Sequence, residues 1–339
     1  MIKIEFEFGA FMNVIPVMHC FDNNYVLPAC ISFYSMLEHA DTNYFYKLYV
    51  IGNEIIEENK QKLFDIVAKF PNASLEFINI DYDFSKLFKK TKNQAHYSKE
   101  IYYKFIPARI FTQYEKIIIT DVDVVFLGDI SKDFVEFDIN EDYYLAGVQT
   151  LYRRDEYLSK DYKLLKKHYS NQEIDKLLTG AGYWIYNLKK MREDNMPEKF
   201  IEFAQKNSKK IVYPEQDTVN LVCYPKIKLL HPKAMVCNHH YRFYQNENDY
   251  KLDNFYPADI VKEALENPIQ LHYAGQKPWT GELTKGRVWL EYVYKLNLID
   301  EYIDLLSKAF KKDKKTILSF KMPFTKNKIF LMKSVKGKK

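Results

Sequence analysis

The sequence predicts an α/β protein built around a mixed, mostly parallel sheet. Three observations support this. Apolar strands alternate with helical patterns from residue 13 onward, 47% of the 339 residues are apolar, and 16% are aromatic. A chain of this length and composition can bury a sizeable core. Strand, polar loop and helix in that order open an α/β unit, whose strands pair in parallel.

Each element follows from the spacing of its apolar residues. The expected strands cover residues 13–20, 45–51, 75–80, 116–121, 143–149 and 182–188. The expected helices continue from residue 25 through 37, and cover 54–70, 97–111, 156–178 and 197–207. Short continuous apolar runs indicate buried strands, and apolar residues three or four apart indicate helices.

Two carboxylates two residues apart, Asp121 and Asp123, follow the apolar run 116–120. Such a pair repels unless a cation lies between its members, and Mg²⁺ or Mn²⁺ with bound phosphate is the usual occupant. The pattern therefore favours phosphate or nucleotide-diphosphate chemistry. The alternative is a strand whose terminal Asp residues only cap a turn.

Polar segments are expected at the ends of several strands. Asp22 follows the first strand and Asp121 the fourth, and in open α/β sheets ligands bind at these carboxyl ends. Both residues should therefore face one crevice. The segments 214–217 and 272–279 are also polar, and strand ends are expected there.

The net charge of +5 is unevenly distributed. Residues 308–339 hold twelve Lys and one Asp, which makes +11 and leaves −6 for the preceding residues. Apolar residues alternate with these lysines, which suits attachment to an anionic membrane surface. A solvated tail is the alternative. Nucleic acid is not expected as a partner, because no recognised binding motif accompanies the charge.

The start of the chain lacks the pattern of a signal peptide, and no run of ~18 apolar residues predicts a transmembrane helix. The four cysteines show no paired spacing, which favours reduced thiols in a cytosol. We therefore expect a cytoplasmic protein that can lie on the inner face of the membrane. Cys237, His239 and His240 would form half of a zinc site, but no second half is apparent.

Taken in order, six segments resemble the retaining glycosyltransferases of family 8, which include bacterial lipopolysaccharide galactosyl- and glucosyltransferases. The segments are Phe21–Tyr25, Tyr103–Phe105, Asp121–Asp123, Gly180–Gly182 with Asn187–Leu188, Glu215–Asp217 and His272–Trp279. The resemblance covers about residues 13 to 300. It implies a single GT-A domain over residues 13–310, followed by a basic, partly apolar tail over 311–339.

The resemblance also implies how a UDP-sugar is bound. Asp22 and Asn24 would recognise the uridine, and Tyr25 would stack on its base. Lys277 would place a charge on the diphosphate, and Gly275 would let the backbone approach it. The alternative for Asp22 and Asn24 is that they only shape the turn between strand and helix.

By the same resemblance, Asp121, Asp123 and His272 bind a divalent ion, with Mn²⁺ favoured and Mg²⁺ as the alternative. The ion would stabilise the charge that grows on the departing UDP. A structural role for His272 on its strand is the alternative. Lys104 would contact the donor where many family members carry Arg, so a bidentate contact would become a single charged one.

The catalytic position of the family corresponds to Gln216. Its amide carbonyl can stabilise oxocarbenium-like charge during front-face attack, with Asp217 or Glu215 as the fallback nucleophile. The alternative for this trio is a helix N-terminus whose acidic residues complement the helix dipole. Gly180 stands where an Asn that binds the donor sugar is common, so no donor preference is implied.

The resulting hypothesis is a metal-dependent retaining hexosyltransferase. It would move glucose or galactose from UDP to a glycan or glycolipid acceptor, such as a lipopolysaccharide core or capsule. One alternative is an inactive scaffold that only binds UDP-sugars. Another is a phosphatase of the haloacid-dehalogenase type, because residues 117–125 also fit its hydrophobic D-x-D-x-V pattern.

Overall fold

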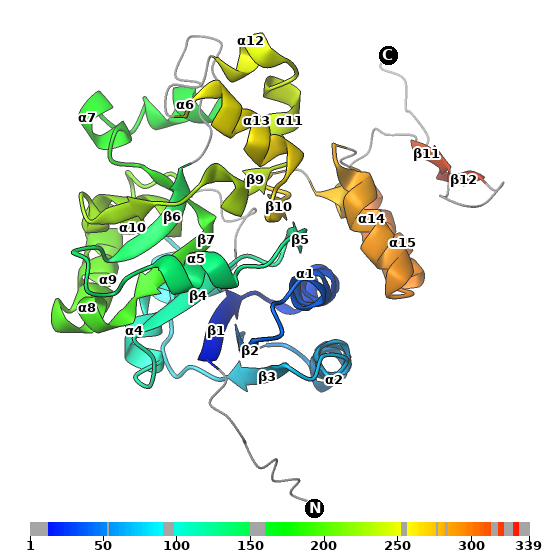
Figure 1. Cartoon of the computed structure of the whole chain (residues 1–339), viewed down its shortest axis with the longest axis horizontal. Coiled ribbons are helices and arrows are strands. Elements are labelled where there is room, and N and C mark those ends of the chain that lie inside the picture. The colour runs from blue at the N-terminus through cyan, green and yellow to red at the C-terminus, as the bar shows by residue number, and fades with distance from the viewer. Residues whose placement is uncertain are drawn as a thin grey trace, which may run out of the picture.

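A seven-stranded sheet forms the centre of the molecule in the computed structural model (Figure 1), with strand order β3-β2-β1-β4-β7-β6-β8. The structure describes residues 13–52, 54–90, 98–149, 160–251, 256–275, 277–281, 284–312, 318–321 and 328–331. The strands of this sheet are β1 (Asn13–Cys20), β2 (Tyr44–Ile51), β3 (Ala73–Ile78), β4 (Lys116–Thr120), β6 (Leu145–Gln149), β7 (Thr179–Asn187) and β8 (Ile227–Leu229).

The sheet is mixed and mostly parallel, as predicted. The pairs β3–β2, β2–β1, β1–β4 and β6–β8 are parallel, whereas β7 runs antiparallel to both β4 and β6. Because β1 and β4 are parallel neighbours, their carboxyl ends lie at the same edge. Asp22 and Asp121, which follow these two strands, therefore lie at the same edge of the sheet.

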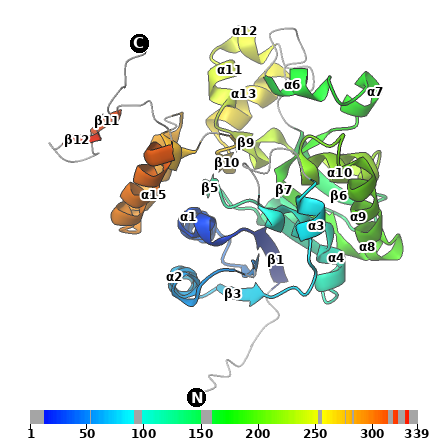
Figure 2. The ribbon, with the colours of Figure 1, turned by 180° about the vertical axis from the view of Figure 1, so that it is seen from behind.

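Helices cover both faces of this sheet, as Figures 1 and 2 show from opposite sides. Alternating residues of β1 make the division visible, because Ile15 and Val17 face one core cluster and Met18 faces the other. The first cluster contains α1 (Val26–Glu38), α2 (Glu57–Val67) and α5 (Ser131–Glu136); the second contains η3 (Lys99–Phe105), α4 (Pro107–Ile110), α8 (Leu188–Glu193), α9 (Met196–Asn207) and α10 (Pro214–Cys223).

A second, three-stranded sheet adjoins the first. Its order is β5 (Val124–Phe126), β10 (Gln270–His272) and β9 (Val236–Cys237), with β5 antiparallel to β10 and β10 parallel to β9. The chain therefore leaves the large sheet after β4 and enters the small one at β5. The two acidic residues predicted as metal ligands lie in this three-residue crossing.

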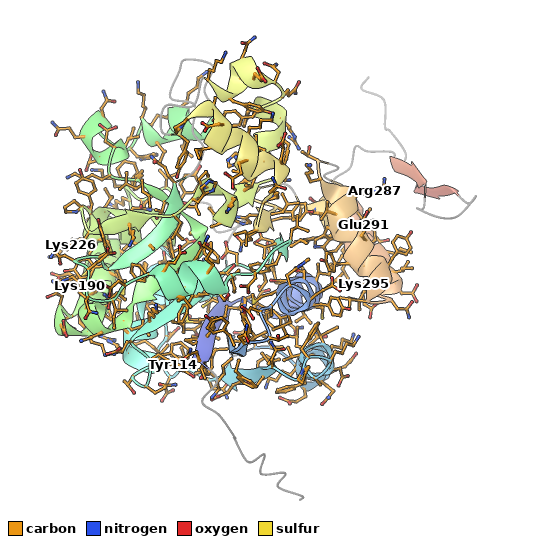
Figure 3. All side chains as sticks on the ribbon, in the orientation of Figure 1. Tyr114, Lys190, Lys226, Arg287, Glu291 and Lys295 are labelled. Carbon is orange, nitrogen blue, oxygen red and sulfur yellow. The ribbon has the colours of Figure 1, made fainter. Side chains whose placement is uncertain are left out.

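The remaining helices are short, or lie outside the sheets. They are α3 (Ser85–Phe88), α6 (Lys160–Leu165), α7 (Asn171–Ile174), α11 (His240–Phe243), α12 (Glu247–Tyr250), α13 (Ala258–Glu266), α14 (Gly286–Lys295) and α15 (Ile299–Lys312), with 3-10 turns η1 (Asn23–Tyr25), η4 (Pro232–Ala234) and η5 (Pro278–Thr280). Along α14, Arg287, Glu291 and Lys295 lie in a row (Figure 3), and Lys295 pairs with Glu38 of α1. This ion pair ties the C-terminal helices to the first α/β unit.

Three predicted segments differ from the structure. Of the helix expected over 156–178, the described residues form two short helices, α6 and α7, because Ser170 caps the start of a new helix. The single helix expected over 97–111 is instead η3 followed by the one-turn helix α4. Pro107 lacks an amide hydrogen and disfavours helical geometry at Ile106, so the two pieces do not join. The segment 214–217, expected at a strand end, forms the first turn of α10, because Pro214 suits the first helical position and Glu215 and Asp217 complement the helix dipole.

The predicted C-terminal tail lies largely outside the described residues. Its described parts, β11 (Leu318–Lys321) and β12 (Lys328–Leu331), pair as an antiparallel hairpin. None of the helices in the described ranges has both the length and the apolar character needed to cross a bilayer.

Candidate active site

The predicted metal ligands are brought together by the junction of the two sheets. Asp121 and Asp123 flank the crossing from β4 to β5, and His272 ends β10, where it pairs with Val124. His272 Nε2 lies 3.3 Å from an oxygen of Asp123 and 3.6 Å from an oxygen of Asp121. One ligand atom from each of the three residues lies within 4.8 Å of the others. Residues 150 positions apart in sequence thus form one cluster.

Each carboxylate of this cluster also binds a lysine. Lys104 Nζ donates to Asp121 Oδ1 at 2.6 Å and to the carbonyl oxygen of Ala181 at 3.0 Å. Lys277 Nζ donates to Asp123 Oδ2 and to the carbonyl oxygen of Tyr273. Both ammonium groups are buried, which by itself lowers the pKa of a lysine, yet the neighbouring carboxylates hold both pKa values above the ordinary one.

The charges of the cluster depend on each other. Burial alone would raise the pKa of Asp123, but Lys277 and His272 together hold it well below its ordinary value. Burial alone would lower the pKa of His272, whereas Asp123 and, to a smaller extent, Cys237 raise it to about 10. Asp123 therefore stays ionised, and its negative charge demands a positive partner.

The donor set fits a hard divalent cation. Asp121 Oδ2 and Asp123 Oδ1, the two oxygens that the lysines do not hold, both face His272 Nε2. Carboxylate oxygens with one imidazole suit Mn²⁺, and Mg²⁺ also binds oxygen donors of this kind. The three residues are therefore the ones that would hold such an ion.

Gly182 of β7 gives the imidazole its place. A Cβ atom at residue 182 would lie 2.5 Å from His272 Nδ1 and 2.6 Å from its Cε1. Any side chain there would push the ring out of its position against the strand. The sequence pattern indicated a glycine-rich segment at 180–182 but gave no sign that its last residue supports the histidine.

The loop after β1 borders the same cluster. The carboxylate of Asp22 accepts hydrogen bonds from the backbone and side-chain amides of Asn24, at 2.9 and 3.3 Å, and so caps η1. Asp22 and Asn24 therefore do shape the turn, whatever they bind. The ring of Tyr25 meets Trp279 edge to face at 6.1 Å, and the charges of Lys277 and Asp123 act on its hydroxyl.

Gly275 turns the chain between His272 and Lys277. Its φ angle of +82° lies in the left-handed region that favours glycine, and among the described residues no atom lies within 4 Å of where its Cβ would be. The turn lets Lys277 reach back to Asp123. His272, a predicted metal ligand, and Lys277, the predicted phosphate-binding lysine, therefore both contact the carboxylate of Asp123.

The trio at the start of α10 is divided by its contacts. Gln216 Oε1 accepts the amide hydrogen of Ala181 at 3.2 Å, which links Gln216 through Ala181 to Lys104. Asp217 Oδ2 accepts from the hydroxyl of Tyr169 and from the amides of Val212 and Tyr213, at 2.7 to 2.9 Å. Asp217 therefore holds the chain before α10, whereas Gln216 is connected to Asp121 through Ala181 and Lys104.

Glu215 is a buried acid, which the sequence indicated only as a fallback nucleophile. Burial raises its pKa to about 7, although the positive charge of Lys104 acts in the opposite direction. Its Oε2 has no hydrogen-bond partner in the described part of the chain. Glu215 and Lys104 are thus two buried ionisable residues close to Asp121, and we call them the buried layer behind Asp121. No sequence pattern predicted the ion pair between Lys104 and Asp121.

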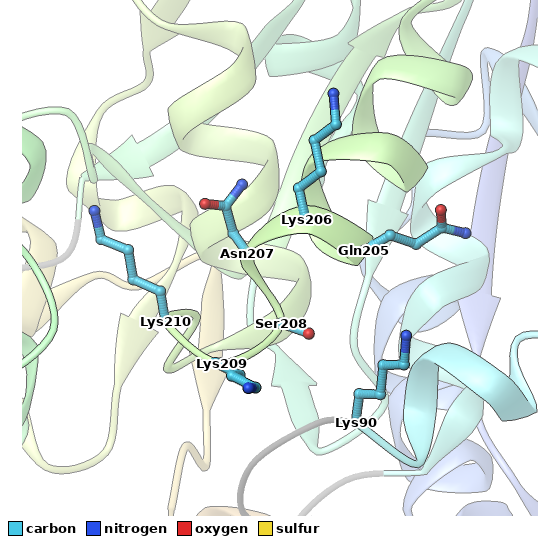
Figure 4. Close-up of a pocket in the computed structure, with 7 residues that line it drawn as sticks. All are labelled: Lys90, Gln205, Lys206, Asn207, Ser208, Lys209 and Lys210. Atoms are coloured by element: carbon cyan, nitrogen blue, oxygen red, sulfur yellow. The ribbon is translucent and has the colours of Figure 1, made fainter.

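A pocket lies at the C-terminal end of α9 (Figure 4). Its lining consists of polar and basic side chains: Lys90, Gln205, Lys206, Asn207, Ser208, Lys209 and Lys210. Two of its lysines are already paired, Lys206 with Glu202 and Lys210 with Glu173. None of the predicted site residues lines it.

The sequence is similar to known proteins over most of its length. The model of a family described as glycosyl transferase family 8 matches residues 16–282. General stress protein A of Bacillus subtilis is 25% identical over 277 residues, which are 79% of this chain and 88% of that protein. A lipopolysaccharide 1,2-glucosyltransferase of Escherichia coli is 24% identical over 262 residues, covering 76% of this chain and 71% of that protein.

Solved structures share the fold. The galactosyltransferase LgtC, in complex with donor and acceptor sugar analogues, aligns with a TM-score of 0.64 and 18% identity over 83% of this chain and 96% of its own. The bifunctional glycosyltransferase WbbM aligns with a TM-score of 0.66 and 22% identity over 88% of this chain. The chain spans about half (53%) of the WbbM chain.

Proposed function

Because the chain belongs to glycosyl transferase family 8, we propose that it is a metal-dependent retaining hexosyltransferase that moves glucose or galactose from a UDP-sugar to a glycan acceptor. The observation that carries the proposal is the convergence of Asp121, Asp123 and His272, whose ligand atoms lie within 4.8 Å of one another. Carboxylates and an imidazole at a sheet edge suit a cation that binds a diphosphate.

The donor would lie between the first loop and this cluster. Tyr25 offers an aromatic face for the uracil, and Asp22 and Asn24 offer polar groups for the uridine. A bound divalent cation would supply positive charge to the diphosphate as UDP departs. Lys277, once it leaves Asp123, would add a second positive charge to the same phosphates. Gly275 leaves room for the backbone to approach them.

Lys104 acts as a positioning residue in this proposal. Its ammonium is 2% exposed and is bound to Asp121 and to the carbonyl oxygen of Ala181. It therefore orients Asp121 and neutralises part of its charge. From the sequence, Lys104 was expected to contact the donor directly. In this proposal it acts on the donor indirectly, through its ion pair with Asp121.

Gln216 is the proposed residue beside the reacting sugar. Its carbonyl oxygen accepts one hydrogen bond from Ala181 and keeps a second lone pair for developing positive charge on the sugar. The acceptor hydroxyl would attack from the face that UDP leaves, and its proton would pass to the departing phosphate. Asp217 would hold the N-terminus of α10, and with it Gln216, in place.

A glycan or glycolipid acceptor of lipopolysaccharide or capsule type is the proposed second substrate. The similarity to a lipopolysaccharide 1,2-glucosyltransferase supports this class. The basic tail, with twelve Lys and one Asp over residues 308–339, would bring the enzyme to an anionic membrane surface on the cytoplasmic side. Truncation after Phe310 should leave hydrolysis of the soluble donor intact and weaken binding to anionic liposomes; undiminished binding would remove the membrane proposal.

The deciding experiment is a donor screen. UDP-glucose, UDP-galactose and their N-acetyl forms are incubated with the full chain, with and without Mn²⁺, and UDP release is measured. We expect Mn²⁺-dependent turnover of one hexose donor, reduced in Gln216→Ala but not in the surface variant Gln61→Ala. Calorimetric binding of UDP-sugars without turnover of any donor would support the inactive scaffold instead.

A further inference from the structure

A second group of side chains that could hold a metal ion lies beside His272. Cys237 ends β9, and His239 and His240 open the turn into α11. One ligand atom from each of the three residues lies within 4.8 Å of the others. The small sheet places this group, because Cys237 pairs with His272 and the amide of Asn238 donates to the carbonyl oxygen of His272 at 2.8 Å.

The three side chains form a compact, largely buried set. Cys237 is 4% exposed and His240 is 2% exposed. The Nδ1 atom of His240 accepts the amide hydrogen of Cys237 at 3.2 Å, and the rings of His239 and His240 meet with centroids 4.6 Å apart. The spacing Cys-x-His-His thus folds into one turn that directs its soft donors toward one another.

The donor types select the ion. A thiolate and two imidazoles, without a carboxylate, suit Zn²⁺ rather than Mg²⁺ or Mn²⁺. Bond lengths of about 2.3 Å to sulfur and about 2.0 Å to nitrogen put tetrahedral ligand atoms roughly 3.5 Å apart. Because the ligand atoms lie within 4.8 Å of one another, binding requires them to approach by at most about 1.3 Å. Water can fill the fourth position, as it does in open zinc sites.

We propose that Cys237, His239 and His240 form a second cation site, selective for Zn²⁺ and distinct from the Asp121, Asp123 and His272 cluster. Binding deprotonates the thiol of Cys237 and releases that proton to solvent while the sulfur–zinc bond forms. The three ligands lie within four consecutive residues, so the ion would close the turn from β9 to α11. That turn supports the strand on which His272 lies.

Cobalt provides the direct test, because Co²⁺ bound to a thiolate gives a charge-transfer absorption that oxygen and nitrogen donors do not give. The full chain is freed of metal with a chelator and titrated with Co²⁺ in excess Mg²⁺. We expect one equivalent to produce this band, and Zn²⁺ to abolish it by displacement. The band should persist in Asp123→Asn, which damages the cluster of Asp121, Asp123 and His272. It should also persist in the matched thiol variant Cys20→Ser.

Two variants address the ligands separately. Cys237→Ser should remove the band, and His239→Gln should weaken Co²⁺ binding at least tenfold while the thiolate remains. Circular dichroism confirms that each variant is folded, and His239→Gln decides alone if Cys237→Ser does not fold. The proposal is overturned if the folded wild type gives no thiolate band with one equivalent of Co²⁺, or if the band survives Cys237→Ser or binding is unchanged in His239→Gln.

Discussion

Two side-chain clusters lie next to each other at the small sheet, and they differ in origin and in chemistry. The oxygen-rich cluster joins Asp121, Asp123 and His272, which are far apart in sequence. The sulfur and nitrogen cluster joins Cys237, His239 and His240 within four residues. Both clusters meet at the pairing of His272 with Cys237. The two proposed sites would therefore favour different ions, because the donor atoms and not the location determine the preference.

The largest effect is expected when the charge of Asp123 is removed, which should impair the oxygen-rich cluster and leave the Cys237, His239 and His240 cluster intact. Asp123→Asn keeps the size of the side chain but removes the charge that a divalent ion requires, so Mn²⁺-dependent UDP binding should weaken by about 100-fold or more. Calorimetry of UDP with Mn²⁺ measures this. Asp138→Asn, at an exposed aspartate, serves as control and should bind as the wild type does. Unchanged binding in Asp123→Asn would contradict the assignment of the oxygen-rich cluster.

A second prediction tests the support of His272. The Cβ of Gly182→Ala would overlap the imidazole ring, so the ring should shift, and donor turnover should fall by about 10- to 100-fold. Unfolding in urea should show a loss of about 1–3 kcal/mol. Gly286→Ala, whose Cβ meets no described atom within 4 Å, should leave both quantities nearly unchanged. Equal effects in the two variants would refute the close-approach argument.

The third prediction is that Lys277→Met changes the affinities for Mn²⁺ and for UDP in opposite directions. Lys277 occupies an oxygen of Asp123, so Lys277→Met should tighten Mn²⁺ binding without nucleotide by about tenfold, while UDP binding in the presence of Mn²⁺ weakens by a similar factor. Binding of Mn²⁺ is followed by its electron spin resonance signal. The exposed Lys132→Met is the control. A weaker affinity for Mn²⁺ alone would show that Lys277 does not compete with the ion.

The smallest expected effect concerns protonation. The folded pKa of Glu215, about 7, exceeds its ordinary value of 4.5, so between these pH values the folded state binds more protons than the unfolded state. The free energy of unfolding must then fall as pH rises through this window, by about 1 kcal/mol per pH unit. Glu215→Gln should flatten the slope measured by urea unfolding from pH 5 to 7.5.

Part of that slope should remain in Glu215→Gln. Asp217 is also buried, and burial raises its pKa to about 6, which acts in the same direction. A slope identical to that of the wild type would mean that Glu215 is already ionised near neutral pH. In that case the buried layer behind Asp121 would not titrate as described.

The sequence by itself determined the α/β class, the first three strands and the presence of two carboxylates after β4. These follow from local rules, because buried parallel strands appear as continuous apolar runs and the polar residues come where those runs stop. The family resemblance also identified His272 and Gln216 as residues of one site. The structure bears out that His272 meets the two aspartates.

Only the tertiary structure decided how the site is built. The antiparallel entry of β7 brings Gly182 beneath His272, and the buried Lys104 reaches Asp121 across 17 residues. The sequence left two interpretations of the 214–217 segment, a strand end and a helix N-terminus, and the structure shows the helix N-terminus. Close approaches and ion pairs of this kind depend on which strands become neighbours, and that choice is made by packing of the whole chain and leaves no periodic signal in any one segment.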